Sequence, residues 1–257
     1  MAAPRAAILC ALFFCALGRT EGRADPIDVT VGLTADALSA SHSINGSPAT
    51  LDVPLPMLTG NARYHAFEVQ AQYLPGLPIS LYNGGQLTNL SILLATARLR
   101  LGDHFTVGVG STLLNQVSSF LPFTNSAAFI DQSTERSRVV GARYVVSYAD
   151  RHSGFSLVAG VTPRMHGRVH DECIETSTFF GTTPCYHISL FTVSEDAAEN
   201  ATEVDAELRV WRPLGRRAEW MYGWRYLNFV GSVFYPRHLD TDQNRGTGPS
   251  VGVRWHI

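Results

Sequence analysis

The chain of 257 residues contains 20 arginines and no lysine, 22 acidic residues, and a formal charge of −2 at pH 7. Because there is no basic excess, the composition excludes the electrostatic footprint that is usual for a nucleic-acid-binding protein. Charged residues make up 16% of the chain, against about 25% in an average soluble domain, while the hydrophobic share of 45% is ordinary. The chain therefore has fewer charged residues than the surface of a soluble domain usually carries. Its length allows one domain or two small ones.

Residues 1–24 are typical of a secretory signal peptide. Arg5 precedes twelve apolar residues, Ala6 to Leu17, and small residues suited to cleavage follow. Twelve residues span about 18 Å as a helix, too short for the ~30 Å hydrocarbon core of a membrane, so an uncleaved anchor is disfavoured. We expect the mature domain to be 25–257 and to be exported.

Two cysteines remain in the exported part, Cys173 and Cys185, and an even pair close in sequence predicts one disulfide that closes a loop. The alternative is a metal site that adds His170 and His187, but no Cys-x-x-Cys spacing supports it. We expect the disulfide, and neither a metal nor a cofactor.

From residue 27 onward, apolar and polar side chains alternate with a period of two, which indicates β-strands with two different faces. In the segment 203–211, apolar residues such as Val204 and Leu208 alternate with a continuous charged face. Similar alternation occurs at 27–34, 65–73, 93–101, 105–110, 140–148, 155–162, 220–226 and 251–257. No apolar run from residue 27 onward reaches the length of about eighteen residues that a membrane-spanning helix needs.

Three further features separate a membrane barrel from a soluble β-sandwich or lipocalin-like barrel, whose strands also alternate. The alternating segments are long enough for tilted membrane strands of about 9–11 residues. The apolar faces end in aromatic residues, as the girdles at the two membrane interfaces require: Tyr73, Tyr148, Trp211, Trp220, Trp224 and Trp255. The opposite faces carry acids and arginines in near-equal number, which suits a polar lumen: Asp28, Glu68, Arg98, Arg100, Arg143, Asp205, Glu207, Arg209, Glu219, Arg225 and Arg254. The sequence predicts an all-β fold, a closed antiparallel transmembrane β-barrel.

The positions of the turns predict the number of strands. Short turns are expected at 102–103, 149–153 and 213–216, and long connections at 115–135, 165–201 and 236–247. In bacterial barrels the short turns face the periplasm and the long loops face outward, so the strand number is even. We expect ten strands: 27–35 opens the barrel, 36–62 is an outer loop, 63–73 descends, and 74–78 turns into a short strand at 79–82. The alternative has eight strands, with 27–62 left in the periplasm and 74–89 as an outer loop.

The signal peptide, the alternating strands with aromatic ends, and the closing strand through Trp255 and His256 resemble small bacterial outer-membrane β-barrel proteins over essentially all of 27–257. The match is to this general architecture and to no particular family. The chain departs from the usual terminal aromatic, because Ile257 is last and Trp255 lies two residues earlier on the same face. The resemblance implies a location in the bacterial outer membrane, contact with its lipids and insertion by the barrel assembly machinery.

Side chains nearly fill the interior of a barrel of eight to ten strands, so the lumen charges predict either a closed plug of ion pairs or a narrow pore. We expect a narrow porin-like passive channel for small solutes or, alternatively, a closed, surface-exposed barrel that meets an extracellular partner through its loops.

A barrel of ten strands also resembles the omptin-type outer-membrane proteases, which use Asp and His at the outer rim. In this chain, however, Asp150 and His152 fall in a short turn at the opposite end of the predicted barrel. A hydrolase would instead need one cluster at the outer rim, made of His166, His170, Asp171 and Glu172 with His238, Asp240 and Asp242. An enzyme is the least favoured of the three functions.

Overall fold

The computed structural model describes residues 27–44, 47–81, 86–126, 129–150, 152–177, 181–184, 194–234 and 239–257. These ranges form the strands β1 Asp28–Ile44, β2 Ser47–Tyr64, β3 Phe67–Leu81, β4 Gln86–Leu101, β5 Phe105–Ser126, β6 Phe129–Asp150, β7 Phe155–Ser177, β8 Gly181–Pro184, β9 Ser194–Pro213, β10 Ala218–Phe234 and β11 Leu239–His256. No helix in these ranges is long and apolar enough to cross a membrane. The predicted signal peptide lies outside the described residues.

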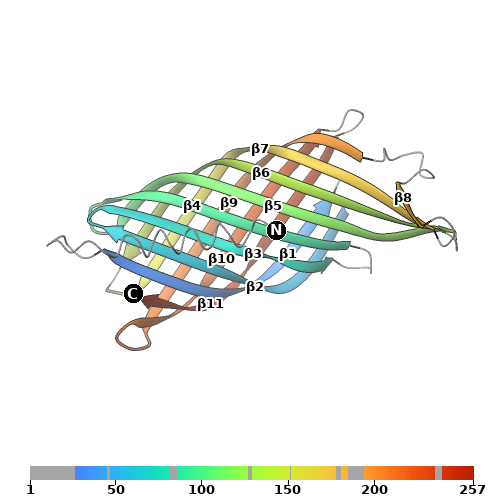
Figure 1. The fold of residues 1–257 in the computed structure, drawn as a ribbon. Coiled ribbons are helices and arrows are strands. Elements are labelled where there is room, and N and C mark those ends of the chain that lie inside the picture. Colours follow the sequence, from blue (N-terminus) through green and yellow to red (C-terminus); the bar gives the residue numbers. More distant parts are fainter. Residues whose placement is uncertain are drawn as a thin grey trace.

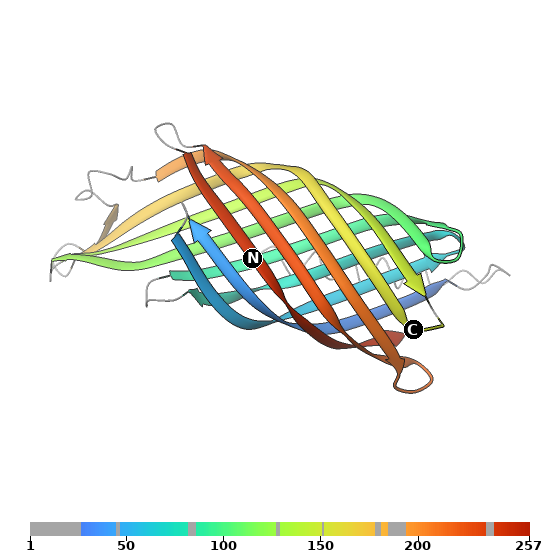
Figure 2. The same ribbon diagram turned by 180° about the vertical axis from the view of Figure 1, so that it is seen from behind.

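Ten of the strands close into one antiparallel barrel (Figures 1 and 2). Each strand from β1 to β7 pairs with the next, β7 pairs with β9, and β9, β10 and β11 continue to a closing seam between β11 and β1. The short β8 pairs only with the end of β7. Closure gives each of the ten strands a paired neighbour on both sides. The predicted closed barrel of ten strands is confirmed, and the alternative of eight is wrong.

The strands extend well beyond the predicted segments. β5, β6 and β7 have 22, 22 and 23 residues, so the expected connections at 115–135 and 165–201 are largely strand. Parts of these extensions have successive polar residues, as in Arg136-Ser137-Arg138, and for that reason they resemble loops in the sequence.

The second strand and its turn were predicted wrongly. β1 continues to Ile44, β2 fills most of the expected outer loop 36–62, and the hairpin turn lies at His65 and Ala66. The expected turn at 74–78 lies inside β3, which has an irregularity in register between Leu74 and Leu77. Prolines concealed these strands, because proline usually marks a loop. Pro54 and Pro56 are tolerated since β2 and β3 pair only from Leu58 onward, and no ladder to β3 needs the N–H groups that proline lacks.

The short connections at 65–66, 102–104, 151–154 and 214–217 lie at one end of the barrel, at the left in Figure 1. We call this the tight-turn end. The beginning of β1 and the C-terminus meet there, because the N–H of Ile257 donates to the carbonyl of Val29. Gly102 and Gly154 turn the chain with φ of 69° and 66°, a left-handed conformation that glycine adopts without steric cost.

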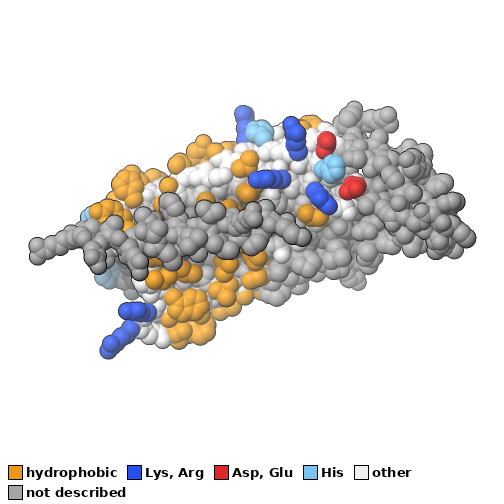
Figure 3. Space-filling model, in the orientation of Figure 1, with side chains coloured by type: hydrophobic (Ala, Val, Ile, Leu, Met, Phe, Trp, Pro, Cys, Tyr) orange, Lys and Arg blue, Asp and Glu red, His pale blue; other side chains and the backbone are white. Residues whose placement is uncertain are grey.

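The outer wall next to the tight-turn end carries a continuous band of exposed apolar side chains (Figure 3). On neighbouring strands it includes Phe105, Val107, Val109, Tyr144, Val146, Leu157, Val161, Val204, Leu208, Tyr222, Trp224 and Val251. We call it the apolar band. Soluble monomers rarely expose an apolar surface that surrounds the molecule in this way.

Candidate functional site in the barrel interior

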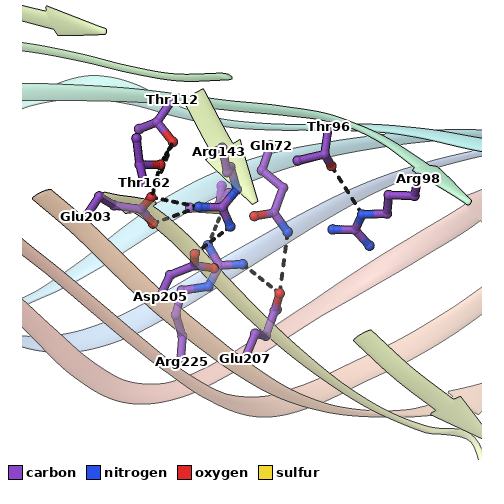
Figure 4. A network of polar contacts seen from close by, with 11 residues as sticks. Gln72, Thr96, Arg98, Thr112, Arg143, Thr162, Glu203, Asp205, Glu207 and Arg225 are labelled. Atoms are coloured by element: carbon purple, nitrogen blue, oxygen red, sulfur yellow. Dashed lines mark hydrogen bonds and ion pairs between the residues drawn. The ribbon is translucent and has the colours of Figure 1, made fainter. Parts of the chain in front are cut away.

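A network of buried charges crosses the lumen and begins on β9. Because side chains alternate along a strand, Glu203, Asp205, Glu207 and Arg209 all point inward. They meet Arg143 on β6 and Arg225 on β10 (Figure 4). Arg225 in turn contacts Asp36 on β1. All of these side chains are less than a tenth exposed.

Arg143 is the first centre of this network. Its Nη1 donates to both carboxylate oxygens of Glu203 at 2.7 and 2.8 Å, and its Nη2 lies 2.5 Å from Asp205 Oδ1. Thr162 donates a further hydrogen bond of 2.6 Å to Glu203. Thr112 lies 2.7 Å from the hydroxyl of Thr162 and also bonds Glu203. Removing a charge from water costs several kcal/mol, which is offset only when partners surround it closely, as here.

Arg225 is the second centre. Its Nη2 lies 3.0 Å from Glu207 and its Nε 3.3 Å from Asp36. Glu207 also accepts a hydrogen bond of 2.9 Å from Arg209 Nε and one of 3.4 Å from the amide of Gln72. The two centres therefore tie strands from opposite parts of the barrel wall to β9 across the lumen.

The absence of a side chain at Gly160 leaves space for the ion pair between Arg143 and Asp205. Gly160 on β7 lies directly behind the contact between Arg143 and Asp205, and a Cβ at this position would come within 2.2 Å of both side chains. The alternation in β7 places residue 160 on the inward face, where any larger residue would displace the ion pair.

A layer of apolar side chains follows the charged network on the side away from the tight turns. Leu114 is the next inward residue after Thr112 on β5, and Ala201 precedes Glu203 in the same way on β9. The full cluster is at most 7% exposed and comprises Leu55, Met57, Leu74, Ile92, Leu94, Leu114, Val139, Met165, Ala201, Leu227 and Phe229. A water-filled pore would leave these inward side chains accessible to solvent. The lumen is therefore filled by two successive layers, one ionic and one apolar.

A polar cavity of about 360 Å³ lies between the network and the tight-turn end. Its lining runs from the buried Arg98 and Glu207 to the half-exposed Asp28 and His256. Ion pairs at its wall join Arg63 to Asp28 at 2.9 Å, and Arg254 to Glu219 with an Nε hydrogen bond of 2.8 Å. Water from the tight-turn end can enter this part of the lumen, which ends at the network.

The predicted lumen residues lie in the network or line this cavity, with one exception. Arg100 lies at the rim, where it donates to the backbone carbonyl of Asp103 at 2.6 Å and braces the turn. Asp36 was missed because its strand was predicted to end before it. Glu203 was missed although its alternation in β9 was visible in the sequence.

The predicted aromatic girdle is only partly on the outer wall. Trp220, Trp224 and Trp255 are exposed there, and Tyr73 is half-buried on the outer face of β3. Tyr148 lies at the rim and stacks on His104 with 5.5 Å between ring centroids. The assignment of Trp211 to the lipid interface is wrong.

Trp211 shares the inward alternation of Glu207 and Arg209 and lines the cavity. The guanidinium of Arg254 lies 5.2 Å from the centre of its ring. The error arose because the residue type was given more weight than the position in the alternation.

Two histidines of the proposed hydrolase cluster, His166 and His170, face the outside of the wall. On β7, His166 Nδ1 lies 2.5 Å from Asn200 Oδ1, and His170 Nδ1 lies 2.8 Å from Asp196 Oδ1. The proposed partners on β11 are three strand spacings away, about 14 Å, because β9 and β10 intervene. His238, Cys185 and the side chains of Asp171, Cys173, Asp240 and Asp242 lie outside the described residues. Among the described side chains, no three His, Cys, Asp or Glu are placed to hold a metal ion.

Comparison with known proteins finds similarity in structure only. No family model matches the sequence, and no curated protein is similar to it. The translocator domain of the autotransporter NalP from Neisseria meningitidis is 10% identical with a TM-score of 0.51, over 99% of this chain and 97% of that one. The outer membrane protease OmpT from Escherichia coli (8%, TM-score 0.49, 90% and 97% covered) and a FadL homologue from Pseudomonas aeruginosa (8%, 0.40, 89% and 90%) are less similar.

The likeness to the NalP translocator domain confirms, at the level of the fold, the resemblance to bacterial outer-membrane β-barrels. An identity of 10% carries no activity from that protein to this one.

Proposed function

We propose that the protein is an integral outer-membrane β-barrel with a closed lumen, which acts through its outer wall and its extracellular end and does not conduct solutes. In the usual orientation of such barrels, the tight-turn end faces the periplasm.

The apolar band supports the membrane location. On β6 the outward residues are apolar or aromatic from Tyr148 to Val140, and the first outward charge is Arg138. Ten residues of strand measure about 33 Å, and a tilt of about 40° reduces this to roughly 25 Å along the barrel axis. That height matches the ~25 Å apolar zone of outer-membrane barrels.

The near-complete burial of the inward side chains is the observation that carries the closed lumen. Arg143, Glu203, Met165 and Phe229 are each at most 2% exposed although all four point into the barrel. A path for water or ions would require both the ionic and the apolar layer to move, and ion pairs buried at this depth are costly to separate.

A narrow channel is the second candidate, and the polar cavity is the observation that favours it. Charged groups line this cavity from the rim to Arg98, as they would line a selective vestibule. In this candidate the two filled layers would rearrange to admit a solute.

Planar-bilayer conductance separates the two candidates. The full chain is refolded, and heat-dependent mobility on a denaturing gel and co-flotation with vesicles establish that it is folded and inserted. We expect no discrete current steps from such a preparation. Reproducible single-channel steps from the inserted protein would contradict the closed lumen and establish the channel.

A further inference from the structure

A group of exposed arginines lies on the outer wall of β6 and β7, beyond the apolar band. Arg136 and Arg138 point outward from β6, and Arg168 points outward from β7. We call these three residues the arginine patch. Figure 3 shows basic side chains on this face next to the apolar band, together with histidine and acidic side chains.

The strand register brings two arginines face to face. Arg138 lies directly opposite Arg168 in the ladder. Like charges at directly opposite positions of a sheet destabilise it. Two carboxylates lie farther along the same face, Asp196, which contacts His170, and Glu172. Among the described ion pairs none joins a carboxylate to Arg138 or Arg168, so an anion from outside the chain would neutralise this facing pair.

The height of the patch restricts the source of this anion. Arg138 lies about 25 Å from the tight-turn rim along the axis, at the far edge of the apolar band. Its next outward neighbours toward that rim, Val140 and Ala142, belong to the part of the wall that would contact hydrocarbon. The guanidinium groups project sideways at the level of the lipid headgroups, where a ligand held in the outer leaflet can reach them. A soluble partner would approach instead from the end of the barrel.

We propose that the arginine patch binds the phosphate groups of a phosphorylated glycolipid of the outer leaflet, the lipid A part of lipopolysaccharide, and this rests on the outer-membrane location proposed above. A planar guanidinium offers parallel N–H donors that match phosphate oxygens, and such charge-assisted hydrogen bonds are stronger than neutral ones. Two arginines on neighbouring strands, about 5 Å apart, clamp one phosphate between them. The lipid would thereby relieve the repulsion between Arg138 and Arg168.

Binding of purified bisphosphorylated lipid A to the refolded full-length protein in detergent tests this proposal. The test variant is Arg138→Gln with Arg168→Gln. The matched control is Arg216→Gln with Arg217→Gln, the same loss of charge at two exposed residues of the tight-turn end. We expect the test variant to bind lipid A at least about tenfold more weakly and the control to bind as the natural protein does. Dephosphorylated lipid A should bind no better to the natural protein than to the test variant.

Four outcomes would overturn the proposal. The first is equal affinity of the test variant and the control, and the second is equal binding of phosphorylated and dephosphorylated lipid. The third is full competition by inorganic phosphate at the concentration of the lipid, which would mean a site for free phosphate. The fourth is a dimer of the natural protein that is lost in the test variant without any change in lipid binding, which would assign the patch to a second copy of the chain.

Heat-dependent mobility and vesicle co-flotation are measured on the same samples. A protein that fails to insert contradicts the outer-membrane location itself. An inserted protein that binds phosphorylated and dephosphorylated lipid A equally contradicts only the lipid site.

Discussion

Replacing Arg143 by methionine removes the guanidinium that neutralises Glu203 and Asp205 in the middle of the barrel. Arg143 and Glu203 are 2% and 0% exposed, so water cannot take over the role of the lost partner. The hydroxyl of Thr162 still reaches Glu203, but it carries no charge.

The expected loss in the free energy of unfolding is about 3–5 kcal/mol, the usual cost of removing one partner of a buried ion pair. The matched control is Arg63→Met, whose partner Asp28 is 42% exposed at the rim of the cavity. An ion pair as exposed as this one contributes only about 0–1 kcal/mol. The triple variant Arg143→Met, Glu203→Gln, Asp205→Asn leaves no buried charge at this centre, and should recover most of the stability that Arg143→Met loses.

The assay is reversible urea unfolding in lipid vesicles, followed by tryptophan fluorescence. The four tryptophans lie on β9, β10 and β11, which lose their pairing when the barrel opens. If Arg143→Met loses no more stability than Arg63→Met, or if the triple variant is as unstable as the single one, then the ion pairs of the first centre do not stabilise the closed lumen as described.

Two further substitutions test the space inside the barrel and the contact outside it. Gly160→Ala places a methyl group within 2.2 Å of Arg143 and Asp205 and should cost about 1–3 kcal/mol in the same unfolding assay. An unchanged midpoint for Gly160→Ala would mean that the pair has room to move. Val109→Arg, in the middle of the apolar band, should cost about 2–4 kcal/mol, and Val117→Arg, beside Arg136 at its far edge, about 0–1 kcal/mol. Equal costs at the two depths would contradict the placement of the band in hydrocarbon.

The fold could be predicted from the sequence because alternation is a direct record of which face a side chain occupies. In β9 every second residue from Glu203 to Arg209 is charged, and this pattern has no simple explanation outside a strand with one polar and one apolar face. The short turns expected at 102–103, 149–153 and 213–216, together with the even strand number of bacterial barrels, predicted ten strands, which the closed barrel confirms.

The strand ends could not be predicted in the same way. Beyond the apolar band the outward residues are polar, so a segment whose inward residue is also polar, such as Arg136-Ser137-Arg138, carries no alternation that separates a strand from a loop. Pro54 and Pro56 also concealed part of β2. A proline lacks the N–H that pairs with a neighbouring strand, so it is tolerated in a strand only where that pairing is incomplete. Whether the pairing of β2 with β3 is complete depends on β3 and cannot be read from the sequence of β2.

The interior could be predicted in its charges but not in its apolar layer. An inward apolar residue beside an outward one produces a continuous apolar run, as at Leu113 and Leu114, and the alternation disappears. The sequence therefore suggested a wholly polar lumen, whereas Leu114 and the cluster around it fill the half of the barrel that lies away from the tight turns.

Quenching of single tryptophans by brominated lipids tests most directly whether the apolar band faces hydrocarbon while the lumen is enclosed. One variant keeps only Trp224, which is 50% exposed on the outer wall, and the other keeps only Trp211, which lies in the cavity under Arg254. We predict strong quenching of Trp224 and weak quenching of Trp211 in vesicles that contain the inserted protein. Equal quenching of the two, or quenching of Trp211 alone, would contradict the assignment of inside and outside on which the account depends.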